Sequence, residues 1–427
     1  MIKIIDQYFL NQLSSGFRRY LANTSWLFLA QFFSLGLSFF ISVFIARYLG
    51  PAIFGNFNYV LSLTTIVGMF FCSSFDFVLV RELVKRPDQR QELLGTFWFI
   101  KLIGGFLTLL IAVIVANFQR VDNLTLGLSI ILAIFYIVQS FNVVGLFFQA
   151  EVAAKNNSQA QIIANLISSV LKIFWLFWGL NVLFLASIYV VDIAINVFLL
   201  IHFYQKLGFS LKSWKFNRSE AVQVLKMSWP LMLSGLSIYA VLRIDQVIIG
   251  VLLDKVAVGY YAVADRLTEI WDFIPKLICL SVFPALINAH RVSLASYQRR
   301  KKMLYSLMVI ISFLIMIPVY FLADWVIIKF FGQEYWPAAE ILKIYIFSLP
   351  GIFLLTAINQ AMLADGREKT IFIINFCGML LNVGLNLLLL PRYGLMGSAW
   401  ATVITFIFLP MTLLIFGRLR LAKNKYD

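Results

Sequence analysis

The sequence predicts an all-α membrane protein with about twelve transmembrane helices, arranged as two pseudo-symmetric six-helix lobes around a central cavity. Of its 427 residues, 61% are hydrophobic and 13% are charged, whereas soluble domains carry roughly 25% charged residues. Apolar runs long enough to cross a bilayer recur along the chain. In addition, one helical hairpin pattern occurs twice, once in each half of the sequence.

The apolar runs set the number of helices. A helix needs about 20 apolar residues to cross the hydrocarbon core of a membrane. Runs of this kind lie at residues 25–46, 57–80, 93–116, 124–147, 160–180, 183–204, 228–252, 257–288, 303–323, 338–362, 370–390 and 395–417.

The repeated hairpin divides the chain into two halves. IARYLGPAIFGNFNYVLSL begins at Ile45, and IIGVLLDKVAVGYYAVADRL begins at Ile248, with the close match starting at Ile249. When they are superimposed, Gly55 falls on Gly259, a shift of 204 residues. Many transporters place a central site between two such repeats. The predicted parts are an interfacial helix (1–22), an N-terminal lobe (23–205), a basic linker (206–226), a C-terminal lobe (227–417) and a basic tail (418–427).

The basic residues indicate the orientation in the membrane. The net charge of +15 does not point to nucleic acid, because the lysines and arginines follow the positive-inside rule. With both termini in the cytoplasm, 23 of them fall in inner segments and five in outer segments. The segment 1–22 is expected to lie on the cytoplasmic membrane surface rather than to be a cleaved signal. It has no small-residue cleavage site after a compact apolar core.

The stretch 240–276 combines apolar residues with charged ones. A charge within a bilayer costs at least a few kcal/mol, so it persists where side chains face one another or a water-filled cavity. Asp265, Glu269, Asp272 and Lys276 are spaced at i, i+4, i+7 and i+11, which is one helical face. We therefore expect two helices that line a polar pathway. Their charged residues are Arg243, Asp245, Asp265, Arg266, Glu269, Asp272 and Lys276.

Other predicted helices carry isolated charges and stripes of amides. Arg81, Lys101 and Lys172 lie within spans, although Arg81 could also extend to the membrane surface. Amide stripes line a cavity or bind neighbouring helices together, and both readings remain open for these residues. The amides expected to line the cavity are Gln161, Asn165, Gln139, Asn142, Asn382 and Asn386.

Several chemistries lack a sequence signal. The chain has two histidines, no cysteine and histidine residues at metal-ligand spacing, and no phosphate-binding glycine-rich loop. We expect no metal, no cofactor, no ATP-driven step and no enzymatic activity. Asp265, Glu269 and Asp272 could serve as acid and base in a membrane-embedded glycosyltransferase or ligase. That alternative is weaker, because the sequence has no long loops to hold a sugar donor.

A set of short motifs resembles a known family. RYLGP followed by FGNFNYVLSL, FFQAE at 147–151, RIDQVIIGVLL followed by VGYYAVADRLTE, FPAL at 283–286 and LPRYGLMGSAWAT at 390–402 occur in order. Together they resemble the polysaccharide transport family of O-antigen flippases, within the multidrug, oligosaccharidyl-lipid and polysaccharide exporter superfamily. The likeness covers essentially the whole chain, and it rests on the order and spacing of the motifs rather than on any one of them.

The resemblance implies a function and a location. A member would move undecaprenyl pyrophosphate-linked oligosaccharide repeat units across the bacterial inner membrane by alternating access, for O-antigen, capsule or exopolysaccharide synthesis. It would act among membrane lipids, alongside polysaccharide polymerase and chain-length machinery.

The implied substrate gives the polar residues their expected roles. An anionic pyrophosphate suits intramembrane arginine and lysine, and sugars suit amides. The acids Asp245, Asp265, Glu269 and Asp272 would balance charge or couple an ion. The expected contacts to phosphate or sugar are Arg243, Arg266, Lys276, Lys172, Lys101 and Arg81.

Three other interpretations remain. An ion-coupled multidrug antiporter of the same superfamily would favour acids and aromatics in its cavity, and the basic residues within the spans argue against it. A lipid II flippase would be longer by two helices. Alternatively, the charged residues pair only with one another, in which case removal of both members of a pair would leave function intact.

Overall fold

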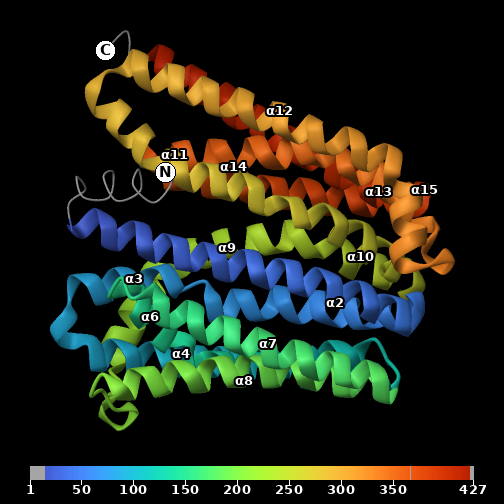
Figure 1. The fold of residues 1–427 in the computed structure, drawn as a ribbon, viewed down its shortest axis with the longest axis horizontal. Coiled ribbons are helices and arrows are strands. Elements are labelled where there is room, and N and C mark those ends of the chain that lie inside the picture. Colours follow the sequence, from blue (N-terminus) through green and yellow to red (C-terminus); the bar gives the residue numbers. More distant parts are fainter. Residues whose placement is uncertain (1–14, 366, 424–427) are drawn as a thin grey trace, which may run out of the picture. The chain divides into compact units, whose positions relative to one another are not determined.

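The computed structural model describes residues 15–365 and 367–423, and all the regular secondary structure in these residues is helical (Figure 1). Short single-turn segments connect or interrupt the helices at several points. The helices are α2 (Ser15–Gly68), α3 (Asp76–Lys85), α4 (Arg90–Phe118), α5 (Asn123–Gln139), α6 (Val143–Ala150), α7 (Ala154–Trp178), α8 (Val182–Lys206), α9 (Arg218–Leu252), α10 (Lys255–Glu269), α11 (Phe273–Val292), α12 (Leu294–Val326), α13 (Pro337–Tyr345), α14 (Leu349–Ala364) and α15 (Glu368–Lys423).

Among the described residues, eight helical segments are long and apolar enough to cross a membrane. Two of these segments, in α2 and α15, each contain two helices joined at a glycine. Gly50 has φ 69° and Gly394 has φ 58°, a left-handed conformation that glycine adopts without steric cost. Helix α9 and the α10–α11 pair lie outside the eight segments. The described residues therefore confirm the predicted all-α polytopic fold.

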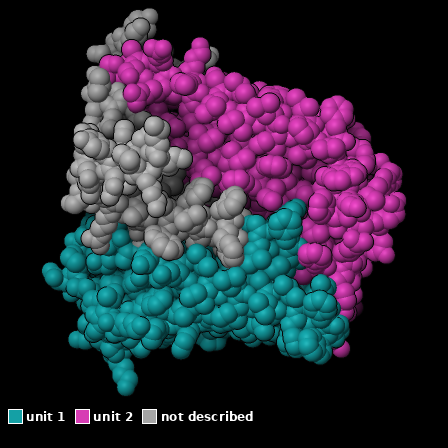
Figure 2. Space-filling model, viewed as in Figure 1, with its two compact units in different colours: residues 1–41, 71–119, 130–229 teal, residues 42–70, 120–129, 230–427 magenta. Residues whose placement is uncertain are grey.

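The contacts divide the chain into two compact units (Figure 2). Unit 1 comprises residues 1–41, 71–119 and 130–229. In it α7 and α8 run side by side (Figure 1), and α3 packs on α6. Its core includes the fully buried rings of Trp175, Phe148 and Tyr204.

Unit 2 comprises residues 42–70, 120–129 and 230–427. In it α14 packs against α11, α12 and α15, with Met308, Leu349 and Phe353 fully buried between them. Residues 42–70 contain the first copy of the repeated hairpin, so unit 2 holds both copies.

The two copies of the hairpin pack against each other through the repeat-related glycines. A Cβ added at Gly55 would lie 1.7 Å from the carbonyl oxygen of Lys255, and one added at Gly259 would lie 2.2 Å from that of Pro51. Lys255 is the repeat equivalent of Pro51, at the same shift of 204 residues. The contact is therefore reciprocal, and any side chain larger than hydrogen at either glycine would push backbone away from backbone.

The predicted division into lobes at 23–205 and 227–417 stays a prediction, since the contact units have different bounds. Most of the predicted interfacial helix, residues 1–14, lies outside the described residues, and α2 already begins at Ser15. At the other end, α15 continues to Lys423, so the first residues of the predicted tail are helical.

Candidate functional site

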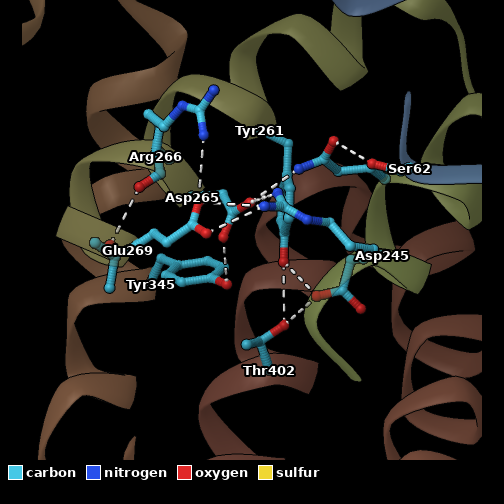
Figure 3. Close-up of polar contacts among 12 residues, drawn as sticks. Ser62, Asp245, Tyr261, Asp265, Arg266, Glu269, Tyr345 and Thr402 are labelled. Atoms are coloured by element: carbon cyan, nitrogen blue, oxygen red, sulfur yellow. Dashed lines mark hydrogen bonds and ion pairs between the residues drawn. The ribbon is translucent and has the colours of Figure 1, made fainter. Parts of the chain in front are cut away.

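Arg243 on α9 lies between two carboxylates of α10, those of Asp265 and Glu269, which Figure 3 labels. Its Nη1 donates to Asp265 Oδ2 at 3.1 Å, and its Nη2 donates to Glu269 Oε1 at 3.1 Å. The two acids are four residues apart and project from one face of the helix, as the sequence predicts. Charge-assisted bonds of this kind are stronger than neutral ones and fix the planar guanidinium in place.

The Asp265 carboxylate also accepts hydrogen bonds from neutral donors. Gln246 Nε2 donates to it at 2.9 Å, and the Tyr345 hydroxyl donates at 3.0 Å. The hydroxyl of Ser62, in the first hairpin, donates in turn to Gln246 Oε1 at 2.8 Å. Asp265 is 8% exposed, so these bonds compensate for the water that its carboxylate lacks.

The other predicted charges on α10 and α11 extend this group. Arg266 Nη1 lies 3.6 Å from Glu269 Oε2, and Lys276 Nζ lies 4.0 Å from Asp272 Oδ2. The Lys276 side chain is 69% exposed. We call the group the charged cluster; its members are Arg243, Arg266, Lys276, Asp265, Glu269 and Asp272. Three formal positive charges face three negative ones, so the cluster can present a net positive charge only if a carboxylate is protonated or displaced.

The space inside the charged cluster is small. A cavity of 20 Å³ is lined by Arg243, Asp265, Glu269, Asp272 and Tyr345, among others. A cavity needs about 10–15 Å³ on this measure to hold one water molecule. The cluster is therefore almost filled by its own side chains, and a ligand must replace one of the existing contacts.

Asp245, a predicted site residue two positions after Arg243 on α9, belongs to a separate network. Its carboxylate accepts from the Tyr261 hydroxyl at 2.6 Å, from Thr402 Oγ1 at 2.5 Å and from Asn386 Nδ2 at 2.8 Å. The Ser398 hydroxyl donates to Asn386 Oδ1 at 2.6 Å. Asp245 is 3% exposed and Asn386 is 0% exposed. These described donors are neutral, and they tie α9 and α10 to α15.

Two of the predicted cavity amides belong to this network. Asn382 and Asn386 are both fully buried, and Asn386 Nδ2 lies within hydrogen-bonding distance of Asn382. Their stripe on α15 therefore binds helices together in this structure, the alternative that the sequence left open.

The predicted basic residues of unit 1 each have a neighbour that offsets their charge. Lys101 Nζ lies 2.5 Å from Asp76 Oδ1, and Lys101 is only 1% exposed. Arg81 pairs with the adjacent Glu82 at 3.1 Å. Lys172 Nζ lies 4.5 Å from the ring centre of Tyr189, a cation–π contact. A role for these residues in substrate binding stays a prediction.

A larger cavity lies within unit 1. Its volume is 280 Å³, and side chains of α5, α6, α7, α8 and the turn before α6 line it. Of the predicted amides, Asn142, Gln161 and Asn165 line this cavity, while Gln139 is not among its lining residues. We call it the amide cavity; its polar lining residues are Asn142, Asn157, Gln161, Asn165, Asp192 and Asn196.

Helical spacing could have identified three lining residues that the sequence reasoning missed. Asn157 precedes Gln161 by four residues on α7, and Asp192 precedes Asn196 by four on α8. Thr402 could also have been identified, because Ser398, Thr402 and Thr405 form a hydroxyl stripe at i, i+4 and i+7 on α15. By contrast, Tyr345 is the single hydroxyl residue of α13, so no periodic pattern points to it.

The helical architecture, with its long apolar segments, is that of a multi-pass membrane protein. The structure is similar to the inward-facing conformation of a multidrug resistance MATE family transporter of the MOP superfamily, with a TM-score of 0.72, 14% identity and coverage of 95% of this chain and 96% of that chain. It is equally similar to the lipid II flippase MurJ in an inward closed conformation, with a TM-score of 0.72, 18% identity and coverage of 92% and 87%.

Sequence comparison then identifies the family. Residues 20–290 match the family described as Polysaccharide biosynthesis protein, and residues 230–388 match the MatE family. The chain is 26% identical over 405 residues to the probable low-salt glycan biosynthesis flippase Agl15 of Haloferax volcanii, covering 89% of this chain and 79% of that protein. This chain belongs to the polysaccharide biosynthesis protein family.

Proposed function

We propose that the protein is a flippase that moves undecaprenyl pyrophosphate-linked oligosaccharide repeat units across a bacterial plasma membrane. The observation that carries the proposal is the charged cluster, which α9, α10, α11 and the turn between α10 and α11 form in a chain of this family. The similar protein described as a probable low-salt glycan biosynthesis flippase supports a glycan as the substrate. The product would feed O-antigen, capsule or exopolysaccharide synthesis, and both termini would lie in the cytoplasm.

The charged cluster provides a way to hold a pyrophosphate. Arg243 offers two donors in a planar fork, which matches two oxygens of a phosphate as well as it matches two carboxylates. Of its two acidic partners, Glu269 has the more exposed side chain, at 39% against 11% for Asp265. In our proposal the pyrophosphate takes the place of Glu269 on Arg243, while Asp265 keeps its bonds to Gln246 and Tyr345.

The remaining members of the cluster assist this exchange. Lys276 is exposed and only loosely paired, so it can meet the substrate first. Arg266 would retain Glu269 after the exchange. Protonation of Glu269 or Asp272 would leave the cluster positively charged, which gives a route by which a proton could couple to substrate binding.

Reconstituted protein tests the proposal. Liposomes carrying the purified full-length chain and a polyprenyl pyrophosphate oligosaccharide should expose inner-leaflet glycan to an external lectin. Empty liposomes should not. Retention of all the glycan in the inner leaflet would overturn the proposal. Extrusion of a lipophilic cation such as ethidium, without movement of the glycan lipid, would favour the multidrug antiporter instead.

A further inference from the structure

We propose that the amide cavity of unit 1 binds one neutral sugar residue of the transported glycan. This inference rests on the proposed function and adds to it a second site, a size limit and a substrate class. The charged cluster would hold the pyrophosphate, whereas the amide cavity would recognise the sugar.

The polar lining of the cavity matches the hydrogen-bonding chemistry of a sugar. Five of its six polar residues are asparagine or glutamine. An amide side chain offers two N–H donors and a carbonyl acceptor, and each sugar hydroxyl both donates and accepts. The ring of Phe135 also lines the cavity, and the apolar C–H face of a sugar ring can pack against an aromatic ring.

The polar groups converge on a shared space. A Cβ added at Gly145 would lie 2.7 Å from Asn142 Oδ1 and 3.3 Å from Asn157 Oδ1. Both amide oxygens, from different helices, therefore approach the same glycine, which also lines the cavity. Glycine at this position leaves room for them, and a methyl group there would displace the Asn142 amide.

The size of the cavity limits what it can hold. Its 280 Å³ lies just below the roughly 300–1,000 Å³ of typical small-ligand sites. That volume suits a single sugar ring, so the rest of a repeat unit would have to remain outside.

The charge of the cavity favours a neutral sugar. Its single charged lining residue is the carboxylate of Asp192. Among the residues that the structure describes, Asp192 Oδ1 is buried and has no hydrogen-bond partner. A hydroxyl donor from a sugar would satisfy that oxygen. The Lys172 ammonium attracts the Asp192 carboxylate, but Lys172 is not among the lining residues of the cavity. A uronic acid inside the cavity would therefore meet the Asp192 carboxylate and be repelled by it.

The test uses the purified full-length chain and the repeat-unit glycan released from its lipid by mild acid. Saturation-transfer NMR should detect binding of the released glycan to the wild type. The double variant Gln161→Leu/Asn165→Leu keeps similar side-chain volume and removes two amides, so binding should weaken at least tenfold. Gly145→Ala should weaken binding as well. Asn117→Leu is the matched control, because Asn117 is exposed and donates within its own helix.

A second comparison tests the substrate class. Asp192→Asn preserves shape and removes the charge, so binding of a uronic acid monosaccharide should increase relative to that of the matching hexose. An unchanged ratio would contradict the charge argument. If wild type and the double variant bind the released glycan equally, or if neither binds it, the inference is overturned. Lectin exposure by wild-type liposomes is scored separately, so a cavity that binds no sugar is distinguishable from a protein that moves no glycan lipid.

Discussion

The charged cluster of unit 2 and the amide cavity of unit 1 bury polar groups in different ways: the first pairs its charges closely, and the second leaves an open space between mostly neutral groups. Each cation of the cluster has a carboxylate within 4.0 Å, and the space between them measures 20 Å³. The amide cavity has a mostly neutral lining and measures 280 Å³. An unpaired buried charge costs far more than an unpaired amide. Charged side chains therefore form close ion pairs, whereas amides can line an open cavity.

The difference has a consequence for ligand binding. A ligand of the charged cluster must displace a carboxylate from an existing ion pair, and the ion pair resists this. A ligand of the amide cavity enters a space that is already open. The two sites should therefore respond differently to mutation.

The largest effect is expected from Arg243→Ala. The change leaves Asp265 and Glu269 without their shared cation, which should cost up to about 3 kcal/mol of stability and abolish glycan export. Arg243→Lys should recover export only in part, because lysine lacks the planar fork. Thermal unfolding and surface glycan at matched protein levels measure the two effects.

The double variant Arg243→Ala/Glu269→Gln separates structure from binding. Removing the cation together with one of its two acids should restore part of the thermal stability, because only Asp265 is left without the cation, but it should not restore export. Recovery of export in the double variant would mean that the pair is only structural.

The amide cavity should show the reverse pattern. Gln161→Leu/Asn165→Leu leaves no charge uncompensated, so the melting temperature should stay within a few degrees of the wild-type value. Export should nevertheless fall about tenfold. A large loss of stability, comparable with that of Arg243→Ala, would show that these amides hold helices together and do not line a binding site.

A smaller effect is expected from Tyr345→Phe. This change removes one of the neutral donors to Asp265 and keeps the ring, which should cost about 1 kcal/mol. Arg243 and Gln246 would still bind the carboxylate, so export should persist. Loss of export equal to that of Arg243→Ala would place Tyr345 in direct contact with the substrate.

Lys255, the first residue of α10, gives the smallest and most specific effect. Its Nζ lies 3.0 Å from the ring centre of Tyr59, and burial lowers its pKa to about 8. Between pH 8 and the ordinary lysine pKa of about 10.4, the unfolded chain binds more protons than the folded chain. Stability should therefore rise with pH over that window. The melting temperature of the wild type, relative to that of Lys255→Met, should therefore rise between pH 7 and pH 10. A constant difference between the two melting temperatures would contradict the shifted pKa.

Much of the fold could be predicted from the sequence, because length and hydropathy alone define a membrane-spanning helix. The shared face of Asp265 and Glu269 followed from a spacing of four residues. The partners of Asp245 did not, because Asn386 and Thr402 lie 141 and 157 residues away along the chain. No local sequence pattern predicts contacts between residues so far apart along the chain. The amide stripes of α7 and α15 look alike in sequence, yet Gln161 lines a cavity and Asn386 is enclosed by other helices. Packing alone distinguishes them.

The central claim is that pyrophosphate replaces Glu269 as the partner of Arg243. It is tested most directly by measuring the affinity of the purified protein for a polyprenyl pyrophosphate that carries no sugar. Glu269→Gln removes the competing carboxylate and should bind this lipid about tenfold more tightly than wild type, whereas Arg243→Ala should bind it hardly at all. Asp324→Asn, which breaks the ion pair with Lys343 elsewhere in unit 2, should leave the affinity unchanged. Unchanged or weaker binding by Glu269→Gln would contradict the account.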